Sequence, residues 1–133
     1  MLRAILISMV IVANNNLIIY TNSTTVPCIN SDGITMLGKN QTNLDAVIGN
    51  SNYDIGHVFS TGGAGVAGQC VVCRTSVKAR VVTGQSSPIG DPFDIDYVTH
   101  EMGHQIGGNH SFNGNSGSDS DDNRKCSFSL VLV

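Results

Sequence analysis

The sequence is poor in several features, and each shortage removes a class of function. Only 13% of the 133 residues are charged, the formal net charge is -3, and the seven lysines and arginines form no cluster. This argues against nucleic acid or an anionic membrane as the main partner. The sequence has no apolar run long enough for a stable membrane span and no internal repeat. With 41% hydrophobic residues, the chain is expected to be globular.

Glutamate is almost absent, which limits the metal sites that the chain can build. The single glutamate is Glu101, and it lies among His100, His104 and His110, which are three of the four histidines. On a helix, His100 and His104 project from one face and can reach one tetrahedral metal ion. A thermolysin-like site would need a downstream glutamate, and none exists. A downstream aspartate could substitute in principle, but His110 is closer and better spaced.

The spacing of these residues predicts a catalytic metal site. Gly107 and Gly108 allow the chain to leave the helix sharply, which brings His110 back as a third ligand. Three histidines with one open position are typical of catalytic zinc, whereas structural zinc sites are closed. The Glu101 carboxylate, beside the ligands, can take a proton from water at the metal.

The pattern HExxHxxGxxH, which ends at His110, is that of the metzincin zinc proteases. Tyr53–Gly68, Val71–Cys73 and Asp94–His104 also resemble the reprolysin (adamalysin-like) branch, most closely its bacterial secreted members. The resemblance extends from about residue 14 to residue 114. It implies a secreted or cell-surface zinc-dependent endopeptidase that hydrolyses peptide bonds.

The resemblance assigns roles to particular residues. It implies one zinc ion bound by His100, His104 and His110, with Glu101 as the catalytic base. The segment Thr61–Gly68 corresponds to an edge strand to which an extended protein or peptide substrate adds as a further strand. The substrate-binding residues expected in this segment are Gly65, Val66, Ala67 and Gly68. A loop between two strands remains the alternative for the same segment.

Three departures from the family pattern indicate a partial domain. No methionine follows His110, so the methionine turn that metzincins place beneath the zinc has no counterpart. Ser111 stands where animal reprolysins usually have an aspartate, and an initial helix and strand are missing. We therefore expect residues 1–114 to be a partial catalytic domain, cut at both ends, and 115–133 to be a divergent linker or truncated end.

The order of elements predicts an α/β domain with a mixed twisted sheet and an active-site helix. In the apolar run Ala4–Ala13 we expect a strand, which would mean that Met1 need not be the natural start; a signal peptide is the alternative. The helix that carries the histidines should turn Tyr97, Val98, Met102 and Ile106 toward the sheet. The other expected elements are an extended piece at Leu17–Thr21, a loop at Thr24–Lys39, a short helix at Asn43–Ile48, strands at Ile55–Ser60 and Val77–Thr83, a turn at Ser86–Asp91, and a helix at Pro92–Ile106 with Asp91 as its cap.

The remaining residues with reactive side chains support further hypotheses. The resemblance implies that Cys73 forms a disulfide, although pairing among Cys28, Cys70, Cys73 and Cys126 stays open. His57 is interpreted as a structural strand residue. The tail offers Asp119, Asp121 and Asp122 as a possible calcium site. Two alternatives to an active protease therefore remain: a zinc-binding but inactive fragment, and a calcium-dependent surface module.

Overall fold

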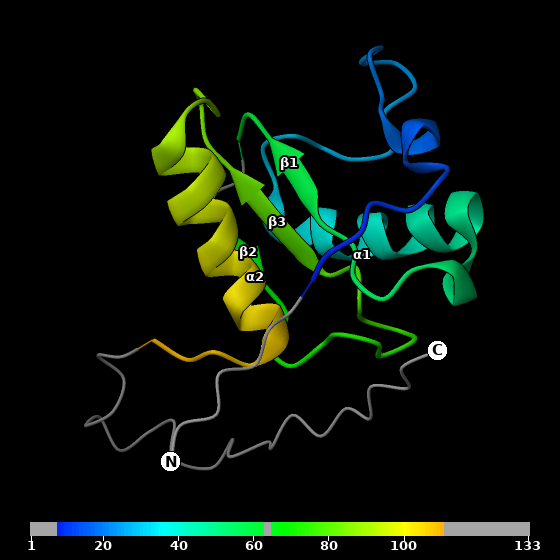
Figure 1. Cartoon of the computed structure of the whole chain (residues 1–133). Coiled ribbons are helices and arrows are strands. Elements are labelled where there is room, and N and C mark those ends of the chain that lie inside the picture. The colour runs from blue at the N-terminus through cyan, green and yellow to red at the C-terminus, as the bar shows by residue number, and fades with distance from the viewer. Residues whose placement is uncertain (1–7, 63–64, 111–133) are drawn as a thin grey trace.

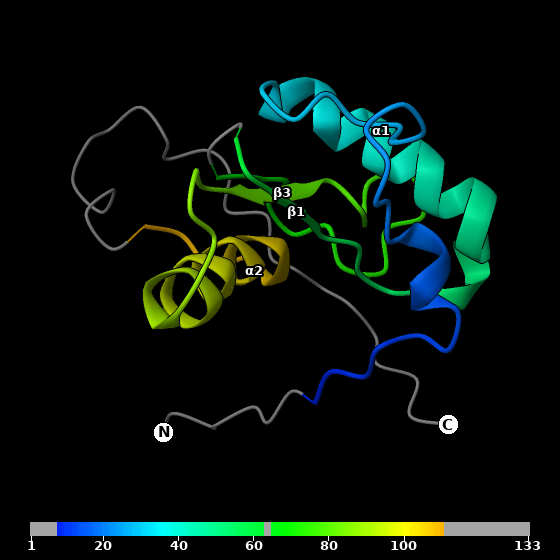
Figure 2. The same cartoon turned by 90° about the horizontal axis from the view of Figure 1, so that it is seen from above.

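A three-stranded sheet lies between two helices in the computed structural model, which describes residues 8–62 and 65–110. Helix α1 (Gly33–Leu44) covers one face of the sheet and helix α2 (Val98–Ile106) covers the other (Figures 1 and 2). The predicted α/β class is confirmed. Within the described ranges, no helix has both the length and the apolar character needed to cross a membrane.

The sheet is mixed, with its most buried strand in the middle. The strands are β1 (Val58–Ser60), β2 (Val66–Ala67) and β3 (Val81–Gly84), in the order β1-β3-β2. Strand β3 runs parallel to β1, with Val82 beside Val58, and antiparallel to β2, with Val82 also beside Val66. All four residues of β3 are buried, as expected for a strand covered on both faces.

The strands predicted at residues 55–60 and 77–83 exist but are shorter than expected. The first was expected from Ile55 and begins at Val58, and the second was expected from Val77 and begins at Val81. Before the second strand the chain makes a tight turn, in which the amide of Arg80 donates to the carbonyl of Val77 at 3.0 Å. The strand was predicted from the β-branched residues of this segment, and such residues also occur in turns, so they do not fix where a strand begins.

The predicted loop at residues 24–39 is wrong from Gly33 onward, where α1 begins. The carboxylate of Asp32 caps this helix by accepting a hydrogen bond from the amide of Thr35 at 3.0 Å. Gly33 and Gly38, although glycine is a poor helix former, both lie within the helix. The cap and the burial of one helix face therefore override their low helix propensity.

The buried face of α1 includes polar residues. The sequence therefore lacks the hydrophobic periodicity by which an amphipathic helix is recognised. Met36, Asn40 and Leu44 are buried at four-residue spacing, together with Gln41. The Asn40 amide donates to the carbonyl of Ala79 at 2.7 Å, and this ties α1 to the chain just before β3. Leu44 and Ala79 also belong to the hydrophobic core between α1 and the sheet.

Helix α1 continues into a π-helical turn, η2 (Asp45–Gly49), and a short 3-10 turn, η3 (Asn50–Asn52). Gly49 adopts a positive φ of 88°, so the prediction that a helix ends near this residue is confirmed. The predicted helix at 43–48 is therefore the end of a longer helical segment. Partial burial raises the pKa of Asp45, but hydrogen bonds from Tyr53, Gln41 and Asn50 outweigh it, so the pKa lies below its usual range.

The strand predicted at Ala4–Ala13 is wrong over its described part, residues 8–13, where no strand forms. Val10 and Ile11 are 88% and 79% exposed, and only Val12 packs against the core. After this run the chain enters a 3-10 helix, η1 (Asn15–Ile18). The described sheet consists of β1, β3 and β2, and the run pairs with none of them. The extended piece predicted at 17–21 is also wrong in its first two residues, which belong to η1.

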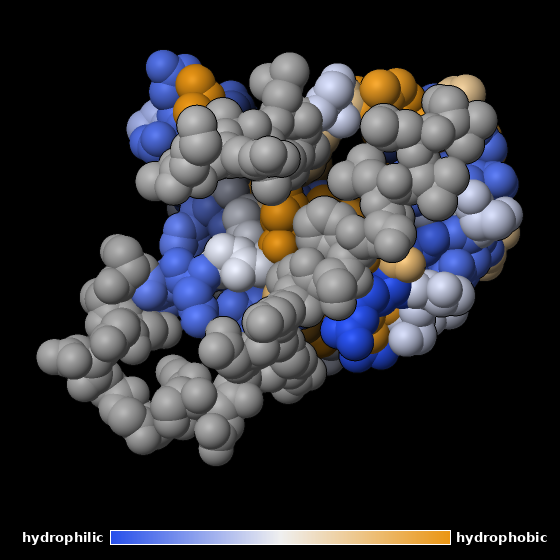
Figure 3. All heavy atoms as spheres, turned by 60° about the horizontal axis from the view of Figure 1, so that its bottom comes forward, coloured by the Kyte–Doolittle hydropathy of each residue, from blue (hydrophilic) through white to orange (hydrophobic). Residues whose placement is uncertain are grey.

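Exposed apolar residues lie mainly in the N-terminal segment and the loops. Among the coloured residues of Figure 3, apolar side chains form small separate patches between hydrophilic ones. The larger exposed apolar side chains in the first part of the chain are those of Met9, Val10, Ile11, Leu17, Ile19, Val26, Ile29 and Ile34.

We predict opposite effects on stability for alanine at two glycines of the first helical segment. A Cβ at Gly38 would meet nothing within 4 Å, so Gly38→Ala should raise the free energy of unfolding by about 0.5–1 kcal/mol. At Gly49 the positive φ and a contact of 2.9 Å with the Asn52 amide nitrogen make alanine unfavourable. Gly49→Ala should therefore destabilise by about 1–2 kcal/mol. Urea unfolding tests both, and the same sign for both variants would contradict this account of α1.

His57 should make stability depend on pH. Burial lowers its pKa from 6.5 to about 4, and its Nε2 atom lies 2.7 Å from the Thr83 hydroxyl. The unfolded chain therefore takes up a proton at higher pH than the folded protein. The stability due to the neutral imidazole is fully present above pH 6.5 and is lost as the pH falls toward 4, by about 3 kcal/mol in total.

Urea unfolding of the wild type and of His57→Phe across this pH range measures the effect, because phenylalanine keeps the stacking on Phe59. The wild type should lose stability relative to the variant as the pH falls. Identical pH profiles for the two proteins would show that His57 does not titrate as described.

Candidate metal centre

The helix that carries the histidines forms as the sequence predicts. A π-helical turn, η4 (Pro92–Tyr97), leads directly into α2, and Pro92 occupies the first turn. The predicted cap is wrong in one respect, because the Asp91 side chain makes no capping hydrogen bond. Asp91 itself has helical angles, φ -49° and ψ -41°, whereas a capping residue is usually extended.

The sheet-facing side of α2 agrees with the predicted one only at Val98. Its buried residues are Val98, Glu101 and Gln105, whereas Met102 and Ile106 are only half-buried. The buried residues follow the three- and four-residue spacing of one helix face. Two polar residues, one of them the predicted catalytic base, therefore occupy the side toward the sheet.

Hydrogen bonds with the segments just before β1 and just after β2 hold the last turn of α2 in place. The amide of Cys70 donates to the carbonyl of His104 at 3.1 Å, and the amide of Val71 donates to the carbonyl of Gln105 at 2.9 Å. The Gln105 side chain, which is fully buried, donates to the carbonyl of Gly56 at 3.2 Å. The bonds from Cys70 and Val71 satisfy carbonyls that a helix end leaves without helical partners.

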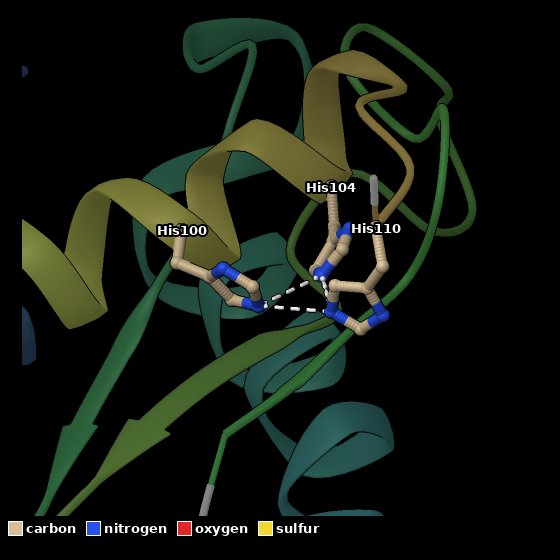
Figure 4. A group of neighbouring side chains, drawn as sticks. All are labelled: His100, His104 and His110. Carbon is tan, nitrogen blue, oxygen red and sulfur yellow. Dashed lines mark hydrogen bonds between the residues drawn. The ribbon is translucent and has the colours of Figure 1, made fainter. Parts of the chain in front are cut away.

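The chain leaves α2 at Gly107, as predicted from the paired glycines. Gly107 has a left-handed φ of 107°, and the amide of Gly108 donates back to the carbonyl of Gly103 at 2.7 Å. The reversal carries His110 toward the helix face that bears His100 and His104 (Figure 4).

The three imidazoles converge on one point. The Nε2 atoms of His100, His104 and His110 lie 3.1 Å from one another in every pair. Ligand atoms about 2.0–2.1 Å from a tetrahedral zinc ion would be about 3.3 Å apart, so the triangle has nearly the size that such an ion requires. Of the described residues, these three form the group that could hold a metal ion.

The hydrogen-bond partner of His104 fixes its tautomer. Its Nδ1 atom lies 2.7 Å from the carbonyl oxygen of Gly108, which can only accept. Nδ1 therefore carries the hydrogen, and Nε2 of the neutral ring has a free lone pair. A second hydrogen bond of this kind orients histidine ligands in metal sites and raises their basicity.

Glu101 lies beside this triangle but is largely withdrawn from solvent, at 4% exposure. Burial raises the pKa of its carboxyl group, while electrostatic interaction with the imidazoles of His100, His104 and His110 opposes the rise. A carboxylate with a raised pKa is suited to accept a proton and give it up again.

The predicted substrate-binding segment lies next to Glu101. Val66 and Ala67 form the edge strand β2, which confirms a strand over this part of the segment, and β2 packs against α2 (Figure 1). A Cβ placed on Gly65 would lie 2.2 Å from Oε1 of Glu101, so any other residue there would have to displace the carboxylate. Gly68 continues the pairing, because its amide donates to the carbonyl of Arg80 at 2.8 Å.

Two other groups of residues do not join the site. His57 lies just before β1, so its prediction as a strand residue is wrong, although its hydrogen bond to Thr83 of β3 agrees with a structural role. The disulfide expected at Cys73 is wrong: Cys73 and Cys28 are free thiols, whereas Cys70 is disulfide-bonded. The aspartates of the tail and the predicted domain 115–133 lie outside the described residues.

Sequence reasoning missed two residues of the site, Tyr97 and Gln105. Both are four residues from Glu101, so helical spacing places them on the same face. Tyr97 was expected only to pack against the sheet, and Gln105 received no role. The four-residue spacing was the signal that could have identified both.

Comparison with known proteins gives one family match. The model of the family described as "Metallo-peptidase family M12B Reprolysin-like" matches residues 2–111. No curated protein and no solved structure matches the chain.

We predict that the chain binds one zinc ion through the three Nε2 atoms. His110→Ala should weaken zinc affinity by on the order of a hundredfold or more, because one of three ligands is lost. His57→Phe, which removes the remaining imidazole of the chain, serves as the matched control and should leave affinity unchanged. Competition titration with a chelating dye measures both. Equal affinity for the wild type and His110→Ala would rule out coordination by all three histidines.

Proposed function

Because the chain belongs to the reprolysin-like metallopeptidases of family M12B, which are zinc-dependent, we propose that it is a zinc-dependent endopeptidase. The observation that carries this proposal is the triangle of Nε2 atoms from His100, His104 and His110. Its edges suit a tetrahedral ion, and it uses three ligands, which leaves one position for water or substrate.

The donor set fits zinc. Imidazole nitrogens are good zinc ligands, and the fixed tautomer of His104 directs a lone pair toward the centre of the triangle. When bound, the ion would supply Lewis acidity, which acidifies water and polarises the carbonyl group of the peptide bond. The residues of the chain then have to orient the reactants and move the proton.

Glu101 is the residue that we assign to proton transfer. Its carboxylate would accept a proton from the attacking water and deliver it to the nitrogen of the leaving amine. The raised pKa of its carboxyl group supports this assignment, since a more basic carboxylate takes a proton from water more readily. Burial between α2 and Gly65 also limits the positions that the carboxylate can adopt.

The substrate proposed for the site is an extended peptide. Strand β2 lies at one edge of the described sheet, so its outer side can pair with an added strand. Main-chain pairing of this kind would bind peptides of varied sequence. We also propose that the protein works in an oxidising compartment, outside the cell or at its surface, because a disulfide at Cys70 is stable there.

One alternative keeps specific support. The sequence has no methionine after His110, so the turn that metzincins place beneath the zinc has no counterpart in this chain. A chain of this kind could bind zinc without cleaving peptides. Cleavage by the zinc-loaded protein separates the two possibilities.

We expect Glu101→Gln to abolish most peptide cleavage, by about a thousandfold or more, while zinc affinity stays near that of the wild type. The amide keeps the size of the side chain but cannot accept the proton. The measurement is cleavage of a mixed-sequence peptide library by each zinc-loaded protein. Asp94→Asn is the matched control, because it makes the same chemical change at an exposed position of η4.

Cleavage by the wild type and by Asp94→Asn, but not by Glu101→Gln, would support the proposed endopeptidase. Equal cleavage by Glu101→Gln would remove Glu101 from the mechanism. One bound zinc ion with no cleavage by the wild type would identify the chain as the inactive alternative.

A further inference from the structure

Tyr97 brings a second polar group to the place where Glu101 acts. A Cβ on Gly65 would lie 2.6 Å from the Tyr97 hydroxyl and 2.2 Å from Oε1 of Glu101. The two oxygens therefore face the same point, and their separation cannot exceed the sum of these distances. One small group, such as a water molecule or an amine nitrogen, can form hydrogen bonds to both.

Neither oxygen is occupied by another residue of the described chain. The Tyr97 hydroxyl and the Glu101 carboxylate make no hydrogen bond to a residue that the structure describes. The oxygen atoms of both groups are accessible to solvent. Both oxygens are therefore accessible and free to form hydrogen bonds to a bound molecule.

The ring of Tyr97 is held in this orientation by packing. Phe93, which is 4% exposed, meets it edge-on, with ring centroids 6.4 Å apart and planes at 90°. Tyr97 is also four residues before Glu101, so both side chains project from one side of the helical segment. The hydroxyl is therefore positioned before any ligand arrives, which reduces the entropy lost on binding.

We propose that Tyr97 is a further catalytic residue, whose hydroxyl oxygen accepts a hydrogen bond from the nitrogen of the leaving amine. This inference rests on the proposed endopeptidase function. As the carbon–nitrogen bond breaks, the nitrogen takes the proton that Glu101 carries and gains both a hydrogen and positive charge. Tyr97 keeps its own proton throughout and supplies an acceptor for that hydrogen, beside the Gly65 end of β2.

The role predicts a dependence on the chemistry of the leaving group. A peptide substrate releases an amine, whereas an ester of the same sequence releases an alcohol, which has no N–H group. Tyr97→Phe should lower kcat for the peptide by about tenfold, the effect of one lost hydrogen bond, and leave KM nearly unchanged. For the matched ester, the variant and the wild type should have the same kcat.

A binding measurement provides a second readout that needs no turnover. A phosphonamidate peptide keeps the N–H group at the position of the leaving nitrogen, and the matching phosphonate has an oxygen there. Tyr97→Phe should weaken the phosphonamidate about tenfold and leave the phosphonate unchanged. Tyr20→Phe is the control, because it removes a hydroxyl that bonds Asn43 instead.

The outcomes separate this inference from the proposed function. A loss confined to the peptide and the phosphonamidate would support the role of Tyr97. If Tyr97→Phe matches the wild type on all four compounds while Glu101→Gln is inactive, the role of Tyr97 is wrong and the endopeptidase assignment stands. If the zinc-loaded wild type neither cleaves the peptide nor binds either phosphorus compound, both proposals fail.

Discussion

The candidate site depends on the way the last turn of α2 is held against the sheet. Helix ends leave carbonyl groups without helical partners. Here the amides of Cys70 and Val71 satisfy the carbonyls of His104 and Gln105, and the buried Gln105 side chain bonds the carbonyl of Gly56. The same segment that closes the helix also continues from β2. The metal-binding helix and the strand proposed to bind substrate are therefore fixed to each other by main-chain hydrogen bonds.

This attachment gives the two sides of α2 different chemistry. The side toward solvent carries the imidazoles of His100 and His104, which the turn at Gly107 completes with His110. The side toward β2 carries Glu101, whose carboxyl pKa is raised by burial. A buried carboxylate beside three imidazoles is unfavourable for stability but favourable for proton transfer. The clearest conflict between folding and function in the described chain therefore lies at Glu101.

The sequence predicted those features that depend on local chemistry. The helix from Pro92, the turn at Gly107 and the convergence of three histidines follow from residues close in the chain, and all are confirmed in the structure. Features that depend on distant contacts were not predicted. Helix α1 was interpreted as a loop because its buried face includes Asn40, which is stabilised by a carbonyl far along the sequence.

The strand predicted at the N-terminus failed for a related reason. An apolar run predicts burial, but a strand also needs a neighbour, and residues 8–13 have none in the described sheet. The sheet-facing side of α2 was predicted from apolar residues alone, so the burial of Glu101 and Gln105 was not predicted. Partner choice over long sequence separations, rather than local propensity, accounts for these errors.

The central claim, that three histidines bind one zinc ion and leave a position open, is tested most directly by zinc K-edge X-ray absorption of the chain loaded with one equivalent of zinc. The account predicts three imidazole nitrogens and one oxygen from water, all at about 2.0–2.1 Å. Sulfur in the coordination shell, or four protein ligands with no water, would contradict it. A cysteine-containing shell would move the zinc away from His110 and leave Glu101 without a role.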